Sequence, residues 1–242
     1  MRIIVNGAGG RMGNAIRAMI EKSPDLTLWG AVDAFCQGEG MVSSLEECQK
    51  GDVIIDFSNH AATKALMDYA VATKTPVVVC TTGHTEQELK SIADAAKEIP
   101  VFHSGNMSVG IALLTRLAKQ TAAMFPDADI EIVESHHNQK LDVPSGTALM
   151  LAKAVQEARP EAELNIGRHE NGKRTKQEVG IHSLRMGNTV GIHEVIVNTG
   201  AQIITLKHEA QDRSLFAEGA LTAAAFLTAQ KAGLYNMKDL VK

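Results

Sequence analysis

One polar segment near the middle of the chain combines the side chains best suited to proton transfer and to binding an acid. It runs from Glu134 to Thr147 and reads Glu-Ser-His-His-Asn-Gln-Lys-Leu-Asp-Val-Pro-Ser-Gly-Thr. His136, His137 and Lys140 offer positive charge and transferable protons within a few residues of one another. The segment is therefore a candidate site for a small acid that must also receive a proton.

The end of this segment predicts the beginning of a helix. Ser145 or Thr147 can cap the apolar run 148–155, and Gly146 lets a ligand approach the backbone closely. The first N–H groups of a helix and its positive end favour anions, so a carboxylate would fit here. The same residue types also occur in a solvated loop before an ordinary helix cap, and the segment alone leaves both interpretations open.

A glycine-rich turn near the N-terminus is the second segment suited to a ligand. The apolar run 2–6 predicts a strand, and residues 14–22 have helical spacing. Between them stand Gly7, Gly10 and Gly13. Glycines at a strand-to-helix turn let a pyrophosphate lie against backbone N–H groups at the start of the helix.

An acidic residue after the next expected strand supports this interpretation. That strand covers 26–32 and ends at Asp33, about 20 residues beyond the turn, where an acid can hold the hydroxyls of a ribose. Met12 stands where the usual G-x-G-x-x-G has its last glycine. The pattern predicts a dinucleotide-binding unit, and the alternative is a structural glycine turn that binds no nucleotide.

Strand and helix patterns continue to alternate through the first half of the chain. Buried strands are expected at 53–57, 77–80 and 101–103, and helices at 60–72, 86–97 and 109–125. This alternation predicts a parallel, doubly wound sheet, which binds ligands beyond the carboxyl ends of its strands. Small or polar residues stand at three such ends: Ser58-Asn59, Thr81-Thr82-Gly83 and Ser104–Met107.

The pattern changes after residue 126. Strands are expected at 128–135, 178–186, 190–198 and 201–209, a polar loop at 157–176, a helix at 212–231 and a short tail after it. Turn signals between the last three strands predict antiparallel neighbours. The expected sheet contains His182, Arg185, His193 and His208. Its histidines are expected on a solvated face or at a subunit contact, with no chemistry assigned.

These patterns predict two domains. The expected fold class is α/β, with a Rossmann-type doubly wound parallel sheet and a second α+β domain built on an open, mainly antiparallel sheet. Residues 1–106 plus 212–242 form the expected dinucleotide-binding domain. Residues 107–211 form the expected substrate-binding and oligomerisation domain.

Composition narrows the class of protein. The chain has 242 residues, 45% of them hydrophobic, and a net charge of -4, so no basic excess points to nucleic acid. No apolar run is long enough for a membrane span, and no signal peptide is recognisable at the N-terminus. Cys36, Cys48 and Cys80 show no metal-ligand spacing and are expected to be reduced thiols. A cytoplasmic protein without a metal is expected.

Several motifs in order resemble those of the 4-hydroxy-tetrahydrodipicolinate reductase (dihydrodipicolinate reductase) family, over essentially the whole chain. They are VNGAGGRMG at 5–13, CTTG at 80–83, GNMSVG at 105–110, ESHHNQKLDVPSGT at 134–147, SLRMG at 183–187, VGIHEV at 190–195 and the tail residues 233–235. The resemblance implies reduction of 4-hydroxy-tetrahydrodipicolinate to tetrahydrodipicolinate by hydride transfer from NAD(P)H, in lysine and diaminopimelate biosynthesis. It also implies a small cyclic dicarboxylate as substrate and a homotetramer assembled through the second sheet.

The resemblance also implies a role for particular residues. His136 and Lys140 are implied as catalytic proton donors or acceptors, and His137, Gly146 and Thr147 as substrate-binding. The implied cofactor-binding residues are Gly7, Ala8, Gly9, Gly10, Arg11, Met12, Asp33, Cys80, Thr81, Thr82, Ser104, Gly105, Asn106 and Met107.

Three positions depart from the family pattern and bear on the cofactor. Cys80 stands where the family commonly has glycine, and Asp33 where glutamate is commoner. Ala34 stands where some members have an arginine that would accept the 2′-phosphate of NADPH. NADH is therefore the favoured cofactor, although Arg11 could still allow NADPH.

Two alternative functions are compatible with a two-domain nicotinamide protein. One is another NAD(P)H-dependent reductase of a small amino-acid-derived substrate, such as a semialdehyde, which needs no second carboxylate site. The other is a non-catalytic NAD(H) sensor that retains the fold. A sensor has no use for two proton donors beside an anion-binding turn. A substrate panel distinguishes the semialdehyde-type reductase from the reductase that the resemblance implies.

Overall fold

The computed structural model describes residues 1–35 and 38–241, which fold into two compact units. The first unit contains residues 1–108 and 214–240, and the second contains residues 109–213 together with Val241. These boundaries lie within two residues of the expected ones at 106–107 and 211–212. In the described residues, no helix combines the length and apolar character that a membrane crossing requires.

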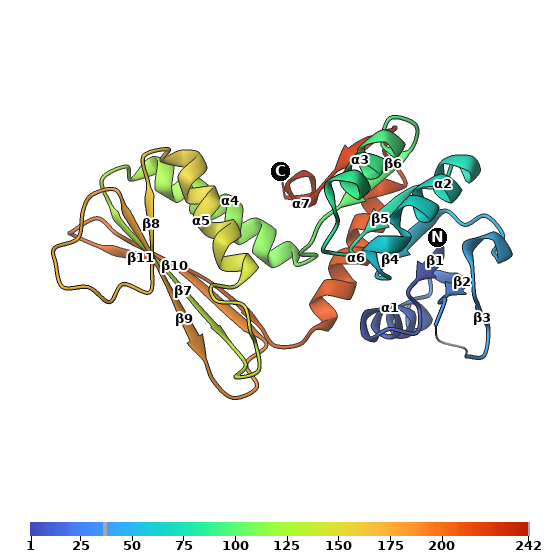
Figure 1. Ribbon diagram of the computed structural model, residues 1–242, viewed down its shortest axis with the longest axis horizontal. Coiled ribbons are helices and arrows are strands. Elements are labelled where there is room, and N and C mark those ends of the chain that lie inside the picture. Colours follow the sequence, from blue (N-terminus) through green and yellow to red (C-terminus); the bar gives the residue numbers. More distant parts are fainter. Residues whose placement is uncertain (36–37, 242) are drawn as a thin grey trace. The chain divides into compact units, whose positions relative to one another are not determined.

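The first unit is built on a parallel sheet that has seven strands in the described residues, in the order β12-β6-β5-β4-β1-β2-β3 (Figure 1). The strands are β1 (Arg2–Asn6), β2 (Thr27–Val32), β3 (Met41–Val42), β4 (Val53–Asp56), β5 (Val77–Val79), β6 (Pro100–His103) and β12 (Gly233–Tyr235). Because all are parallel, their carboxyl ends meet along one edge, where the glycine turn and the polar loops lie.

Helices cover both faces of this sheet, as a doubly wound fold requires. They are α1 (Arg11–Glu21), α2 (Thr63–Thr73), α3 (Glu86–Ala95), α6 (Ser214–Leu227) and the short α7 (Met237–Leu240), with 3-10 turns at Leu45–Glu47 and His60–Ala62. Apolar side chains of α2 and α3 pack on one face, against strand residues such as Ile4 and Ile54. Helices α1 and α6 contact each other, and α6 packs on β4, β5 and β6.

The second unit has a sheet of five strands in the described residues, in the order β11-β10-β7-β9-β8. The strands are β7 (Asp129–His136), β8 (Glu163–Ile166), β9 (Glu178–Arg185), β10 (Gly191–Asn198) and β11 (Ile203–Ala210). Helices α4 (Val109–Met124) and α5 (Gly146–Ala158) bury one face of it (Figure 1). The two architectures together confirm the expected fold class.

The expectation that the last three strands form consecutive antiparallel neighbours was wrong for β9 and β10. Strand β7 lies between them, parallel to β9 and antiparallel to β10. The connection at 186–190 must therefore span two strand spacings, about 9.5 Å, which five residues can do. A turn signal in a sequence does not say whether a strand lies between the two that it joins.

Three short elements in the second half of the chain were missed. The expected polar loop 157–176 contains the edge strand β8, and the expected tail contains β12 and α7. An edge strand of four residues with polar members gives no clear alternation, and a three-residue strand gives none. Of the cysteines, Cys48 and Cys80 are free thiols, while Cys36 lies outside the described residues.

A glycine in α6 allows this helix to touch the loop after β6. A Cβ atom built on Gly219 would overlap the carbonyl oxygen of Met107, a backbone atom that cannot rotate away. The residues around Gly219 on the buried side of α6 are also small, which permits the close approach.

We expect Gly219→Ala to destabilise the protein by about 1–3 kcal/mol through this overlap. Alanine has a better helix propensity than glycine by about 1 kcal/mol, but the overlap outweighs that gain. Urea unfolding measures the change. Gly146→Ala is the matched control, because a Cβ at this helical position meets nothing within 4 Å. Equal stability of the two variants would contradict the prediction.

Candidate active site

The second sheet places a group of polar side chains on its helix-covered face, at one end. Ile130, Ile132, Val195 and Val197 belong to the apolar core beneath α4 and α5. Side chains alternate between the two faces of a strand, so the even positions of β7 and the odd positions of β10 share the covered face. The polar members that continue this face beyond the core are Glu134 and His136 on β7, Arg185 on β9 and His193 on β10.

The centre of this group is the carboxylate of Glu134, whose side chain is fully buried. Its Oε2 accepts from His136 Nδ1 at 2.5 Å and from Arg185 Nη1 at 2.9 Å. Its Oε1 accepts from Arg185 Nη2 at 2.8 Å and from the backbone N–H of Ser145 at 3.1 Å. The carboxylate is thus bound by a bidentate arginine, a histidine and the cap residue of α5, and connects β7, β9 and α5.

These contacts hold Glu134 ionised. Burial raises the pKa of its carboxyl, but hydrogen bonds from Arg185, Ser183, His136 and Ser145 outweigh burial and bring the pKa down to about 2. The pKa of His136 is lowered from its ordinary value, first by burial, although Glu134 opposes this shift. A negative carboxylate beside a mostly neutral imidazole is therefore the state near neutral pH.

A second buried histidine connects His136 to the helix cap. The rings of His136 and His193 meet edge to face with centroids 5.1 Å apart. His193 Nε2 lies 3.2 Å from Ser145 Oγ, which also accepts from the Ala148 N–H as the N-cap of α5. Burial and the nearby His136 lower the pKa of His193 to about 4. His193 is therefore a neutral packing and hydrogen-bonding partner, not a proton donor, at neutral pH.

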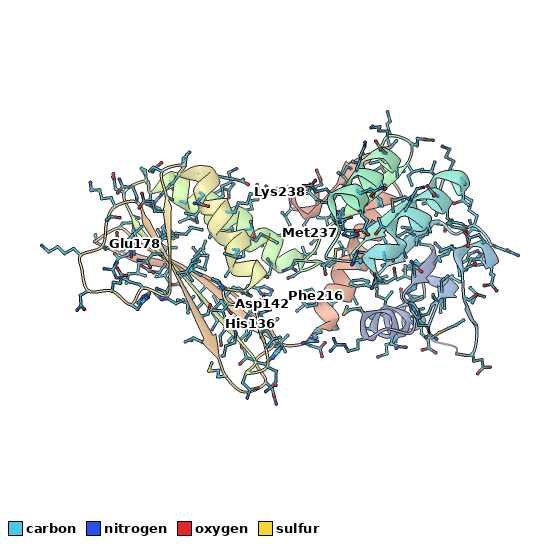
Figure 2. All side chains as sticks on the ribbon, in the orientation of Figure 1. His136, Asp142, Glu178, Phe216, Met237 and Lys238 are labelled. Carbon is cyan, nitrogen blue, oxygen red and sulfur yellow. The ribbon has the colours of Figure 1, made fainter. Side chains whose placement is uncertain are left out.

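The loop between β7 and α5 brings Lys140 to the same end of the sheet. The Lys140 Nζ lies 2.8 Å from Asp142 Oδ1, and the positive charge of Lys140 contributes to the lowered pKa of His136. Arg185 Nη2 donates to the backbone oxygen of Asp142 at 2.7 Å. Figure 2 shows His136 on β7 and Asp142 in the loop that follows. The structure thus collects the expected residues His136, Lys140 and Gly146 around one helix terminus.

One expectation about the sheet histidines was wrong. His193 was expected on a solvated face or at a subunit contact, but it is only 4% exposed. Arg185, to which no role was assigned, binds Glu134. His182, in contrast, lies on the open face and pairs with Glu131. Glu134 and Ser145 were also missed as partners. The spacing of Glu134 and His136, two residues apart on one strand, was the available signal, because it places both on one face.

In the first unit, the glycine turn after β1 has the geometry that a phosphate needs. Gly7 has φ +80, and a Cβ there would lie 2.6 Å from the carbonyl oxygen of Phe57, so only glycine is unstrained. Gly10 is the N-cap of α1 without a side-chain cap, and the first turn of α1 carries no acid. Arg11 is exposed at the start of the helix, and Ala8 is buried beneath it.

Asp33 closes the turn from the tip of β2. Its Oδ2 accepts from the Gly9 N–H at 2.9 Å and its Oδ1 from the Phe35 N–H at 3.0 Å. A cavity of about 430 Å³ opens beside it, lined by Gly7, Gly10 and Asp33 and by residues at the ends of β1 to β4 and at the start of α2: Asn6, Val32, Ala34, Phe35, Ser43, Ser44, Leu45, Glu46, Phe57, Ser58, Asn59, Ala62, Ala65 and Leu66. Its shape and place suit the adenosine part of a dinucleotide.

The remaining expected cofactor residues lie further along the same edge, outside the lining of that cavity. Thr81 Oγ1 donates to the buried carboxylate of Asp56 at 2.7 Å, which also accepts from Asn6 and Ser58. Ser104 Oγ donates to the Asn106 carbonyl at 2.7 Å and shapes the next loop. The two loops touch, because a Cβ at Gly105 would lie 3.4 Å from Thr82.

Two of the expected cofactor side chains point into the protein. The thiol of Cys80 is buried, and burial raises its pKa well above its ordinary value. The side chain of Met107 is only 2% exposed. Neither side chain is therefore exposed to a cofactor in this structure.

The pH dependence of stability tests the neutral state of His193. Its pKa is about 4 in the folded protein against 6.5 ordinarily, so the unfolded chain binds the extra proton first as the pH falls. Stability from this residue is complete above pH 6.5 and is lost between pH 6.5 and 4, by about 3 kcal/mol.

Between pH 6.5 and 4 we expect the unfolding free energy of His193→Gln to fall by about 3 kcal/mol less than that of the wild type. Denaturant unfolding at several pH values measures it. His169→Gln, at an exposed histidine of the same unit, is the control and should follow the wild type. A His193→Gln variant with an unchanged pH profile would show that burial does not keep His193 neutral.

Both units of the protein match a known protein family. Residues 1–107 match the family model "Dihydrodipicolinate reductase, N-terminus" and residues 110–241 match "Dihydrodipicolinate reductase, C-terminus". The 4-hydroxy-tetrahydrodipicolinate reductase of Caldanaerobacter subterraneus subsp. tengcongensis is 45% identical, covering 100% of this chain and 98% of the relative. That of Clostridium novyi is 40% identical, again covering 100% of this chain and 98% of the relative.

A solved structure shares the fold over the whole length. Dipicolinate-bound dihydrodipicolinate reductase from Paenisporosarcina sp. TG-14 has a TM-score of 0.85 and 23% sequence identity, covering 99% of each chain. The glycine turn and the Glu134–Thr147 segment thus lie within the two regions that the family models match. Since those models and the full-length relatives together span the chain, it belongs to the dihydrodipicolinate reductase family.

Proposed function

We propose that this protein reduces 4-hydroxy-tetrahydrodipicolinate to tetrahydrodipicolinate, in the biosynthesis of diaminopimelate and lysine. As a member of its family the protein is an NAD(P)H-dependent oxidoreductase. The observation that carries the proposal is the buried Glu134 network, which fixes His136 and the start of α5 beside Lys140. Such an arrangement suits an anionic substrate that must gain a proton.

The first unit fits the cofactor. When bound, NAD(P)H supplies the hydride. Gly7, Gly10 and the open first turn of α1 would hold the pyrophosphate, and Asp33 the adenine ribose beside the cavity. The loops at 80–82 and 104–107 would contact the nicotinamide end through their backbone and small side chains. The Asp56 carboxylate supports this edge by holding Asn6, Ser58 and Thr81 together.

The second unit would bind and protonate the substrate. The first N–H groups of α5, at Gly146 and Thr147, would hold one carboxylate, with His137 beside them. Lys140 would neutralise negative charge and donate the proton. Most of the rate gain would come from orienting the ring and from stabilising charge that develops as the hydride arrives.

The geometry favours Lys140 over His136 as the acid. Because a carboxylate only accepts, the proton of a neutral His136 stands on Nδ1, which faces Glu134. The opposite nitrogen, Nε2, then carries a lone pair and accepts hydrogen bonds. The lowered pKa of His136 keeps this state dominant near pH 7. His136 therefore orients the substrate and accepts a hydrogen bond, and Lys140 donates the proton.

The cavity lining favours NADH over NADPH. Among the described residues that line it, Asp33 and Glu46 are carboxylates and none is Lys or Arg. The 2′-phosphate of NADPH would add a dianion close to Asp33, with only Ala34 where an arginine could compensate it. Arg11, exposed at the start of α1, is the nearest candidate that could reduce the discrimination.

We further propose a homotetramer in the cytoplasm, assembled through the second sheet. One face of this sheet is covered by α4 and α5, while the other carries exposed apolar side chains, including Leu184 and Ile203. A sheet with exposed apolar side chains on its open face fits self-association. Sedimentation of the purified protein measures the number of subunits.

Oxidation of NADH and of NADPH at 340 nm tests the reaction and the cofactor choice together. Substrate is made fresh from pyruvate and aspartate semialdehyde by the preceding enzyme. We expect turnover that depends on that enzyme, with kcat/KM roughly tenfold higher for NADH because of the charge near Asp33. Tight NADH binding without turnover would instead favour a semialdehyde reductase or a sensor.

Ala34→Arg should reduce the preference for NADH over NADPH about tenfold, because a guanidinium pairs well with the 2′-phosphate of NADPH. Ala34→Gln is the matched control, of similar length without the charge, and should leave the preference unchanged. An unchanged preference in Ala34→Arg would show that the 2′-phosphate does not lie near this position.

Substitutions of Lys140 separate its charge from its proton. We expect Lys140→Ala to lower kcat by about 10²–10⁴-fold, the usual contribution of a general acid, and to raise KM. Lys140→Arg keeps the charge but cannot donate at neutral pH, so kcat falls while KM changes less. Steady-state kinetics measure both, and Lys153→Ala, on the exposed side of α5, is the control. Near-wild-type turnover in Lys140→Ala would overturn the assignment.

A further inference from the structure

Asp142 places a carboxylate of the chain itself at the helix terminus proposed to bind the substrate. Its Oδ1 lies 2.8 Å from Lys140 Nζ. Its pKa lies below the ordinary value, chiefly through the hydrogen bond from Lys140, with a further hydrogen bond from the backbone N–H of Gly146. The Asp142 carboxylate thus uses two of the donors that the proposed function assigns to a substrate carboxylate.

The backbone around Asp142 is anchored while its side chain is accessible. Arg185 holds the Asp142 carbonyl at 2.7 Å, and Ser145 is held through Glu134. The side chain of Asp142 is 57% exposed, and the neighbours Leu141 and Val143 are exposed as well. A change of the Asp142 rotamer would therefore release Lys140 and the Gly146 N–H without moving the loop backbone or exposing buried apolar surface.

We propose that Asp142 stands in for a substrate carboxylate and is displaced when a dicarboxylate binds. The inference rests on the proposed function, because it takes Lys140 and the start of α5 as the substrate site. In the free protein the contact with Asp142 holds the Lys140 side chain at the anion position. A ligand gains that position only by offering a carboxylate that replaces the one it displaces, so Asp142 contributes to specificity for ligands that carry a carboxylate.

The energetic size of the effect is modest. Exposed ion pairs are worth about 0.2–1 kcal/mol, and the competing pair here is half exposed. Removing the charge of Asp142 should therefore tighten the binding of a dicarboxylate by about two- to fivefold. If Asp142 served only to hold Lys140 in place, the same substitution would weaken binding. The sign of the change distinguishes the two roles.

Calorimetric titration with dipicolinate (pyridine-2,6-dicarboxylate) in the presence of NADH tests the sign. We expect Asp142→Asn to lower the Kd about two- to fivefold relative to the wild type. Glu157→Gln is the matched control: it removes the partner of Lys119, also 2.8 Å away, in the same unit. The control should bind as the wild type does. Unchanged or weaker binding by Asp142→Asn overturns the inference.

A crystal structure of the wild-type complex with dipicolinate tests the displacement directly and does not depend on the folding of a variant. We expect a ligand carboxylate within hydrogen-bond distance of Lys140 Nζ and of the Gly146 N–H, with the Asp142 carboxylate turned away. An Asp142–Lys140 pair that persists in the complex overturns the inference but leaves the proposed function intact. A wild-type protein that neither binds dipicolinate nor reduces the substrate defeats the proposed function itself.

Discussion

The second unit depends on the satisfaction of one buried carboxylate. Glu134 lies beneath the start of α5 without access to water, and removing one partner of such a buried pair typically costs about 3–5 kcal/mol. Arg185, His136 and the Ser145 N–H meet this need from a neighbouring strand, the same strand and a helix. The same contacts fix the imidazole, the helix cap and the loop that carries Lys140. Stability and the placement of the chemistry therefore share one set of hydrogen bonds.

The two proposed anion sites are built in different ways. In the first, the Gly7 turn and the uncapped start of α1 present backbone N–H groups, and the carboxylate of Asp33 accepts from the Gly9 N–H beside them. In the second, the start of α5 is capped by Ser145 and flanked by Lys140, so charged side chains add to the backbone donors. The first arrangement suits a phosphate held through backbone contacts. The second suits a carboxylate held by backbone and charged side chains together.

Much of the fold follows from local patterns in the sequence. Alternating strands and helices predicted the parallel sheet, and the spacing of Gly7, Gly10 and Asp33 predicted the edge where the cavity lies. The strand β8 and the insertion of β7 between β9 and β10 were not predictable in this way. Strand order depends on which edges pair in space, and a turn of five residues is compatible with either neighbour.

The sequence by itself determined the types of the groups proposed to act: a histidine pair, a lysine and a capped helix in one segment, together with a glycine turn and an acid. Only the tertiary structure decided their partners. Arg185 on β9 and His193 on β10 stand about 50 to 60 residues beyond Glu134. They come close to it because the strand registers align His136 with Arg185 and Glu134 with His193. Hydrogen bonds and desolvation act over a few ångströms in space, so the protonation states of Glu134, His136 and His193 could not be assigned before that register was known.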